Sequence, residues 1–96
     1  MVPGGAGKQD AWINSMFHVY VLISRKNGRR YVGMTTDPEL RLEAHNSGQV
    51  KSTAPFAPYD MRILQVHESG RDARKAEKYF KSGFGRKAMD RLLARG

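Results

Sequence analysis

Two tyrosines in the first half of the chain, Tyr20 and Tyr31, are the first side chains whose type and spacing suggest a site. They lie in two segments rich in β-branched and aromatic residues, 17–24 and 30–35, which predict paired β-strands. Pairing places both tyrosines on one face of a sheet, where Gly33 leaves the backbone open to close approach. Their hydroxyls could therefore border one shallow groove. The alternative is that tyrosine is simply favoured on a half-exposed strand.

The turn between these strands sets the distance between the tyrosines. Asn27-Gly28 favours a two-residue type I′ turn, which pairs Tyr20 with Thr35. Tyr31 is then four residues away from Tyr20 along the sheet, or ~13 Å, so the two rings should flank a site from different sides. The opposite face is uniformly apolar and is expected to meet the core; its members are Phe17, Val19, Val21, Ile23, Val32 and Met34.

A helix predicted for residues 38–47 carries a second pair of polar side chains. The Asp37-Pro38 pair is a strong helix start, and Gly48 is a plausible stop. Arg41 and His45 are four residues apart, so they lie on one stripe of this helix and point together. They could serve a common site or form only a cationic stripe on the surface.

The carboxylate of Glu77 is predicted to lie where a later amphipathic helix meets the core. Ser69 or Asp72 can cap this helix, which should continue to about Ser82. On the helical wheel, Glu77 falls next to apolar residues such as Phe80. A carboxylate in that position needs a cation or a metal ion, because burying it unpaired is costly. An arginine at the edge of the core would satisfy it equally well.

Basic and hydroxyl-bearing side chains accompany these candidates. Residues 48–58 show no periodicity and predict a loop, and the helix around Glu77 is rich in lysine and arginine. Such side chains suit contacts with the phosphate backbone of nucleic acid, although a solvated surface would look the same. The residues expected to contact nucleic acid are Gly33, Lys51, Ser52, Thr53, Arg74, Lys78 and Lys81.

Composition restricts the class of protein. Lysine and arginine number 17 against 9 aspartates and glutamates, and the formal charge of +8 favours nucleic acid or an acidic membrane surface as partner. The 96 residues have room for one domain, expected at 16–96 after a flexible tail at 1–15. The sequence lacks an apolar run long enough to span a bilayer, which predicts a cytoplasmic protein without a membrane partner. Without cysteine, oxygen or imidazole must hold any metal ion.

Two further elements complete an α+β chain. Residues 59–68 predict a third strand buried at its centre, and residues 86–95 predict a short terminal helix. Neither a phosphate-binding G-x-x-x-x-G-K-[ST] loop nor a zinc-binding H-E-x-x-H motif is present. The cluster of carboxylates expected of a nuclease that uses two metal ions is also missing.

The chain carries four short motifs that resemble those of the GIY-YIG endonuclease superfamily, most closely its small stand-alone members. Each motif alone is loose, but their order and spacing over residues 17–95 are specific. His18 departs from the family pattern, which usually has glycine there. The motifs are H-V-Y at His18–Tyr20, Y-V-G at Tyr31–Gly33, T-x-x-P-x-x-R-L-x-x-H-N-S-G ending at Gly48, and A-x-K-Y-F-K-S at Ala76–Ser82, with Glu77 inside the last.

The resemblance implies a small three-stranded antiparallel sheet flanked by helices, and endonuclease activity on nucleic acid, expected to be DNA. It also implies one Mg²⁺ or Mn²⁺ ion bound by Glu77, and no small-molecule cofactor. A single ligating carboxylate is reasonable, because Mg²⁺ commonly keeps several waters and takes further ligands from substrate phosphates.

The same resemblance implies catalytic roles for Tyr20, Tyr31, Arg41 and His45. Tyr20 is the preferred base; a phenol with a pKa of about 10 needs a nearby metal ion or guanidinium to favour the phenolate or to orient water. Arg41 would stabilise the extra negative charge of the pentacoordinate phosphate. Tyr31 and His45 would position water or relay a proton.

Two other functions are compatible with this composition. One is a nucleic-acid-binding module that has the same fold and little or no cleavage activity. Retention of all five candidate site residues argues against it, since binding alone requires only a basic surface. The other is a basic subunit of a protein assembly, which would need an exposed apolar patch that so short a core can hardly spare. The sequence does not indicate the oligomeric state.

Overall fold

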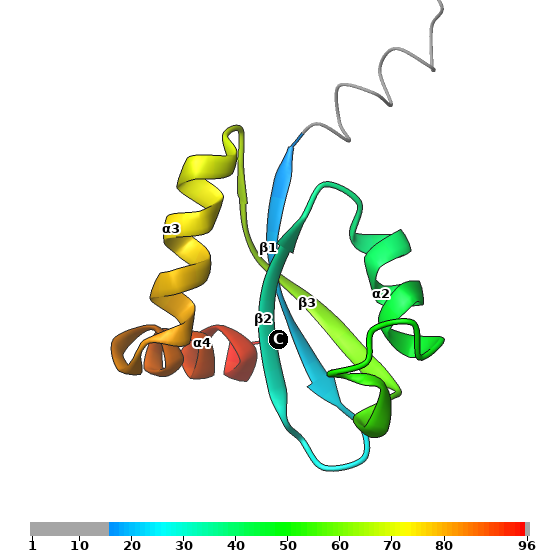
Figure 1. Ribbon diagram of the computed structural model, residues 1–96. Coiled ribbons are helices and arrows are strands. Elements are labelled where there is room, and N and C mark those ends of the chain that lie inside the picture. Colours follow the sequence, from blue (N-terminus) through cyan, green and yellow to red (C-terminus); the bar gives the residue numbers. More distant parts are fainter. Residues whose placement is uncertain (1–15, 96) are drawn as a thin grey trace, which may run out of the picture.

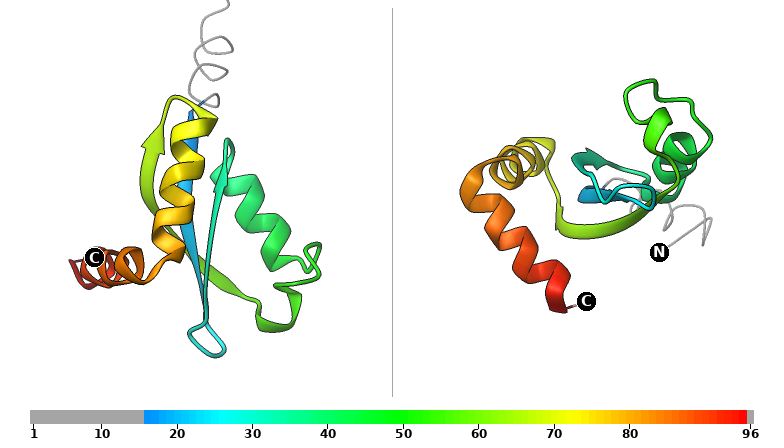
Figure 2. Two further views of the ribbon diagram at one scale, coloured as in Figure 1. Left: turned by 60° about the vertical axis from the view of Figure 1, so that its left-hand side comes forward. Right: turned by 90° about the horizontal axis from the view of Figure 1, so that it is seen from below.

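A computed structural model describes residues 16–95, so the tail predicted at 1–15 lies outside the described residues. It contains a three-stranded antiparallel sheet of strand order β2-β1-β3 with helices on both faces, as expected (Figures 1 and 2). No helix in the described part is both long enough and apolar enough to cross a membrane. The elements are β1 (Phe17–Ser24), β2 (Arg30–Thr35), α2 (Pro38–Asn46), the 3₁₀ turn η1 (Ala54–Phe56), β3 (Tyr59–His67), α3 (Gly70–Lys81) and α4 (Gly83–Arg95).

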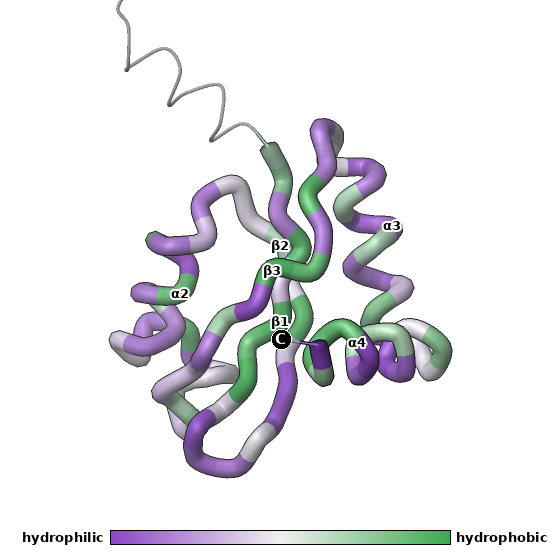
Figure 3. The backbone as a smooth tube through the Cα atoms, turned by 180° about the vertical axis from the view of Figure 1, so that it is seen from behind, coloured by the Kyte–Doolittle hydropathy of each residue, from purple (hydrophilic) through white to green (hydrophobic). Residues whose placement is uncertain are grey.

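The central strand β1 is buried on both faces, and each face packs against different helices. On one face, Val19 and Val21 contact the buried side chains Ala73, Phe80 and Met89 of α3 and α4. The other face forms a second cluster around Tyr20, Leu22 and Tyr59, which Leu42 of α2 and Phe56 of η1 cover. Hydrophobic residues accordingly gather along the strands in Figure 3. The apolar face predicted from the sequence is confirmed as the core face.

The hairpin between β1 and β2 differs from the prediction in its turn. Tyr20 pairs with Gly33, not with Thr35. The amide of Ser24 donates to the carbonyl oxygen of Arg29, so the loop has four residues, 25–28, instead of two. A type I′ turn requires positive φ at both central residues, but only Gly28 has it (φ 76°). The hydroxyl of Ser24 instead accepts hydrogen bonds from the backbone amides of Lys26 and Asn27. The register therefore shifts by two residues, which preserves the faces and moves Tyr31 two residues closer to Tyr20.

The helix caps follow the sequence signals. The Asp37 carboxylate accepts a hydrogen bond from the amide of Leu40 at 3.1 Å and begins α2, and Gly48 follows its end with φ 82°. Of the two caps considered for α3, Ser69 is the one used, and its hydroxyl accepts from the amide of Asp72.

Two predicted elements need correction. β3 is not buried at its centre, because it is an edge strand of the sheet; its Ile63 is 44% exposed. A bulge at Leu64 also interrupts its pairing with β1. α4 begins three residues earlier than predicted and includes Gly85. A Cβ at Gly85 would lie 1.7 Å from the carbonyl oxygen of Tyr79, so α3 and α4 can meet this closely only at a glycine.

Candidate active site

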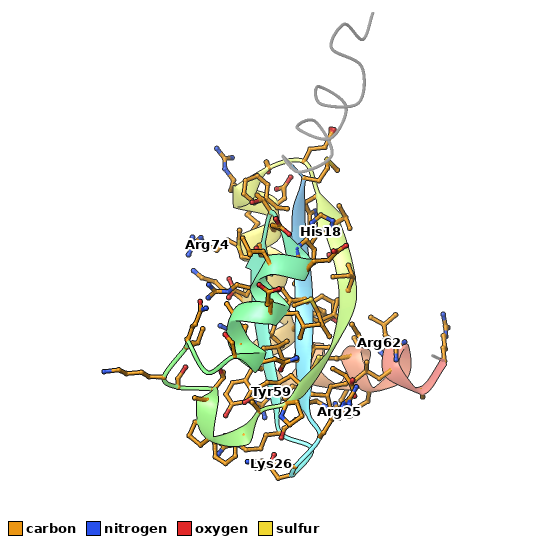
Figure 4. The ribbon with its side chains drawn as sticks, turned by 90° about the vertical axis from the view of Figure 1, so that its right-hand side faces the viewer. His18, Arg25, Lys26, Tyr59, Arg62 and Arg74 are labelled. Atoms are coloured by element: carbon orange, nitrogen blue, oxygen red, sulfur yellow. The ribbon has the colours of Figure 1, made fainter. Side chains whose placement is uncertain are left out.

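One hollow on the α2 side of β1 and β2 collects all five residues proposed for catalysis and metal binding. It lies between α2, the loop after it and α3. In Figure 4, which faces this side, Arg74 reaches outward from α3 and Tyr59 lies inside, beside η1. The hollow is lined by Tyr20, Leu22, Tyr31, Val32, Gly33, Met34, Arg41, His45, Val50, Ser52, Thr53, Arg74 and Glu77.

Tyr20 and Gly33 form a matched pair across β1 and β2. The phenol ring lies over Gly33, where an added Cβ would be 2.6 Å from the tyrosine oxygen and 2.8 Å from the ring carbon that bears it. Gly33 was expected to leave its backbone open to nucleic acid, but the ring of Tyr20 occupies that space. Tyr20 is only 4% exposed, so its ring is rigidly packed at the floor of the hollow.

Tyr31 lies diagonally opposite Tyr20, because Leu22 is its partner in the pairing of β1 with β2. Its ring meets the ring of Tyr59 edge-on, with centroids 5.8 Å apart. The guanidinium carbon of Arg29 lies 5.8 Å from the centroid of the Tyr31 ring. The two tyrosines of the site are therefore on the same face, as predicted, and closer than the predicted register allowed.

Arg41 and His45 of α2 point together, as their spacing predicted, and both line the hollow. Arg41 is exposed, whereas His45 is only 5% exposed and packs edge-on against Tyr20, with ring centroids 6.5 Å apart. Burial lowers the pKa of His45 below its ordinary value of 6.5, and the positive charge of Arg41 lowers it further. The imidazole is therefore neutral at pH 7.

A buried hydrogen-bond network holds His45 in place. Nδ1 of His45 is 2.7 Å from Oγ1 of Thr53, and the hydroxyl of Tyr59 donates to the carbonyl oxygen of Thr53 at 2.8 Å. The Asn46 side chain accepts from the amide of Tyr59 at 2.7 Å and so joins α2 to β3. Thr53 was predicted to contact nucleic acid; it is 3% exposed, and its hydroxyl faces His45 instead.

Sequence reasoning missed Asn46 and Tyr59 as supports of the site. Asn46 falls inside the H-N-S-G motif, which was the available signal for it. Tyr59 begins β3 directly after Pro58 and resembles any other strand tyrosine in the sequence. Its pKa is raised, chiefly by burial and then by Tyr31, so it stays protonated as a hydrogen-bond donor.

Glu77 lies at the rim of the hollow, between the buried residues Ala73 and Phe80 of α3. Its side chain is 18% exposed, and Oε2 accepts a hydrogen bond from Nζ of Lys81 at 3.2 Å. The partner is thus a lysine one turn later on the same helix, not an arginine at the edge of the core. Within residues 16–95, no group of three or more histidine or acidic residues is arranged to hold a metal ion.

The residues proposed to contact nucleic acid are distributed around this hollow. Ser52 and Arg74 line it, while Lys51, Lys78 and Lys81 are exposed outside it. A second hollow adjoins the first through Tyr31 and Val32, which line both. It runs between β2 and α4 and adds three cationic side chains, those of Arg30, Lys81 and Arg86.

Comparison with known proteins identifies the family. The family described as "GIY-YIG catalytic domain" matches residues 16–90. A UPF0213 protein of Bacillus cereus is 34% identical over 80 residues, which cover 82% of each chain. Another of Enterococcus faecalis is 35% identical over 71 residues, or 71% of this chain and 81% of the relative. No solved structure gave a significant match. This protein belongs to the GIY-YIG nuclease domain family.

Proposed function

We propose that this protein is a divalent-metal-dependent endonuclease that hydrolyses phosphodiester bonds in DNA. Membership of the family supports nuclease chemistry. The observation that carries the proposal furthest is the convergence of Tyr20, Tyr31, Arg41, His45 and Glu77 from four separate elements on one hollow. A module that only binds nucleic acid has no need for a half-buried carboxylate among cations, because that charge repels phosphate.

Glu77 would hold one Mg²⁺ or Mn²⁺ ion. The residues present fit such an ion. The Glu77 carboxylate lines an open hollow, and its Oε2 atom is paired with Lys81, whose side chain is exposed. A site with a single carboxylate leaves most coordination positions to water and to phosphate oxygens, which Mg²⁺ prefers. When bound, the ion would neutralise charge on the scissile phosphate and its leaving oxygen.

The other side chains of the hollow would bind and orient the reacting groups. Arg41 is exposed at the mouth and would contact the scissile phosphate, stabilising the negative charge that grows as water attacks. Tyr20, in its phenolate form, would accept a proton from the attacking water. Tyr31 would hold that water from the side of β2. The rigid packing of Tyr20 over Gly33 favours a fixed position for the base.

DNA would follow the basic surface around the hollow. Ser52 and Arg74 would contact phosphates next to the scissile bond, and Lys51 and Lys78 phosphates farther away. The adjoining hollow between β2 and α4 would bind the DNA on one side of the cleavage site, with contacts from Arg30, Lys81 and Arg86. Thr53 and Gly33 would act indirectly, through His45 and Tyr20.

Glu77→Gln tests the proposal, with Glu68→Gln as control because Glu68 is an exposed glutamate outside the hollow. With labelled DNA duplexes and branched structures in Mg²⁺, Glu77→Gln should lose cleavage and the control should keep it. The folded state should survive, since the lost pair with Lys81 is worth only ~0.3–0.5 kcal/mol. Binding to DNA in EDTA should persist or tighten.

The same measurements separate the alternatives. A binding module would show metal-independent DNA binding and no cleavage by the unaltered protein in Mg²⁺ or Mn²⁺. A purely structural Glu77 would lower the melting temperature of Glu77→Gln, and activity would fall only with the folded fraction. Full, metal-dependent cleavage by Glu77→Gln would contradict the metal site.

A further inference from the structure

The imidazole of His45 has one nitrogen in a short hydrogen bond and one with no partner. Nδ1 lies 2.7 Å from Oγ1 of Thr53. Nε2 is fully buried, and no other group within residues 16–95 is in hydrogen-bonding position. A buried polar atom without a partner is unusual and costly, so its role depends on whether it carries a hydrogen.

The hydroxyl of Thr53 decides which nitrogen carries the hydrogen. This hydroxyl has one hydrogen and two possible acceptors, Nδ1 of His45 at 2.7 Å and the carbonyl oxygen of Val50 at 3.3 Å. The Val50 oxygen already accepts the backbone amides of Thr53 at 3.1 Å and Ala54 at 2.9 Å, and these use both of its lone pairs. The shorter contact to Nδ1 is therefore the one in which the hydroxyl donates.

We propose that Thr53 is a positioning residue that fixes His45 as the neutral tautomer with its hydrogen on Nε2, so that His45 serves the site as a hydrogen-bond donor and not as a proton acceptor. A neutral ring that accepts a hydrogen bond at Nδ1 must carry its single hydrogen on Nε2. The lowered pKa of His45 supports the neutral form. The donor role rests on the proposed nuclease function, whereas the tautomer does not.

The supports of Thr53 are consistent with a fixed orientation. Its carbonyl oxygen accepts the hydroxyl of Tyr59, and the backbone amide of Tyr59 is in turn bonded to Asn46 on α2. Both ends of the Thr53–His45 bond are thus attached to the same helix and strand. These bonds hold the backbone of Thr53 beside α2 and so keep its hydroxyl within reach of Nδ1 of His45.

The partner of the Nε2 hydrogen is an oxygen that reaches it during the reaction. Two oxygens of the site have this chemistry: a phosphate oxygen of DNA, and the hydroxyl oxygen of Tyr20, whose ring already packs edge-on against His45. In either case the free protein leaves a buried donor unsatisfied, and the reacting complex satisfies it. A hydrogen bond that forms only in the reacting complex stabilises that complex and not the free protein, and such a difference in stabilisation lowers the barrier of the reaction.

Nitrogen-15 NMR of the histidine rings in the metal-free protein tests the tautomer directly. His45 should show a protonated Nε2 and an unprotonated Nδ1 at pH 7, and His18 and His67 provide internal comparison. Thr53→Ser should keep this pattern because it keeps the hydroxyl. Thr53→Val should convert it to a mixture of tautomers or to Nδ1–H. A protonated Nδ1 in the unaltered protein would overturn the assignment, whether or not the protein cleaves DNA.

Replacement of His45 tests the donor role. The amide nitrogen of glutamine can take the place of Nε2–H but cannot accept a proton, whereas leucine can do neither. Cleavage by His45→Gln should exceed cleavage by His45→Leu at least tenfold, measured on equal amounts of folded protein. Equal loss in both variants would overturn the donor role. If the unaltered protein does not cleave DNA, the proposed function fails while the tautomer result stands.

The Nε2–H resonance also identifies its acceptor. A shift on adding a short DNA duplex in EDTA, retained in Tyr20→Phe, would identify a phosphate oxygen. A shift on adding DNA that is lost in Tyr20→Phe would identify the tyrosine oxygen. A resonance that does not respond to DNA in either protein would contradict a donor role in the site.

Discussion

At the scale of single residues, the fit between Tyr20 and Gly33 leads to the first prediction. In Gly33→Ala the new Cβ would collide with the phenol, so the ring must move away from its place beside His45. Overpacking of this kind costs roughly 1–3 kcal/mol, and cleavage should fall further than the folded fraction does. Gly83→Ala is the control, because a Cβ there meets nothing within 4 Å. Thermal unfolding and cleavage of both variants provide the comparison.

His45 gives a second prediction, concerning the pH dependence of stability. Its pKa in the folded protein lies below the unfolded value of 6.5, so the unfolded chain takes up a proton more readily. The contribution of the neutral ring to stability is complete above pH 6.5 and is lost as pH falls through the lowered pKa. The melting temperature of the unaltered protein should therefore drop more between pH 7.5 and 5.5 than that of His45→Gln. Parallel curves would contradict this.

The sequence predicted the site residues better than their supports. Tyr20, Arg41 and Glu77 stand at positions where strand or helix periodicity gives each side chain a direction, and the family resemblance then implied that they share one site. Thr53 lies in a loop without periodicity. Its contact with His45 depends on how the loop returns under α2, and short-range patterns carry no information about that path.

At the scale of elements, the start of α2 determines how firmly Arg41 and His45 are held. The Asp37 carboxylate is the side-chain cap of this nine-residue helix. Asp37→Ala should reduce the free energy of unfolding by about 1 kcal/mol, and Asp37→Asn, which keeps a capping oxygen, should cost much less. Chemical denaturation of the two variants measures the difference. Equal stability would mean that packing alone holds the helix end.

The hairpin and the third strand show where local patterns mislead. Asn27-Gly28 is a strong turn signal, but the hydroxyl of Ser24 stabilises a wider loop by accepting two backbone amides. The apolar residues of β3 suggested burial, yet a three-stranded sheet has two edges and β3 occupies one of them. Strand order is a property of the whole sheet, and periodicity within one segment does not reveal it.

At the scale of the whole molecule, the charge of +8 predicts binding that depends strongly on salt. The logarithm of the affinity for duplex DNA should fall by about 0.9 per neutralised phosphate for each tenfold rise in salt. Arg86 lines the hollow between β2 and α4. Arg86→Gln should therefore reduce the magnitude of this slope by about 0.9, the contribution of one phosphate contact. Arg91→Gln is the matched control, since Arg91 is exposed on the same helix and lines none of the described hollows. Identical slopes for both variants would exclude the second hollow from the DNA path.

The position of β1 at the centre of the sheet also bears on how this protein can evolve. Neighbouring residues along the strand point to opposite faces of the sheet. Val19 and Val21 pack in the core against α3 and α4, and Tyr20 between them lies at the bottom of the hollow. Tolerance to substitution should therefore alternate along the strand. Apolar residues of similar volume can replace the valines, but Tyr20 should tolerate no replacement, because no other residue has a hydroxyl on an aromatic ring. Because a slip of one residue would exchange the two faces, insertions and deletions in β1 should remove fold and activity together. New specificities are consequently more accessible through the loop after α2 and through the surface of α4.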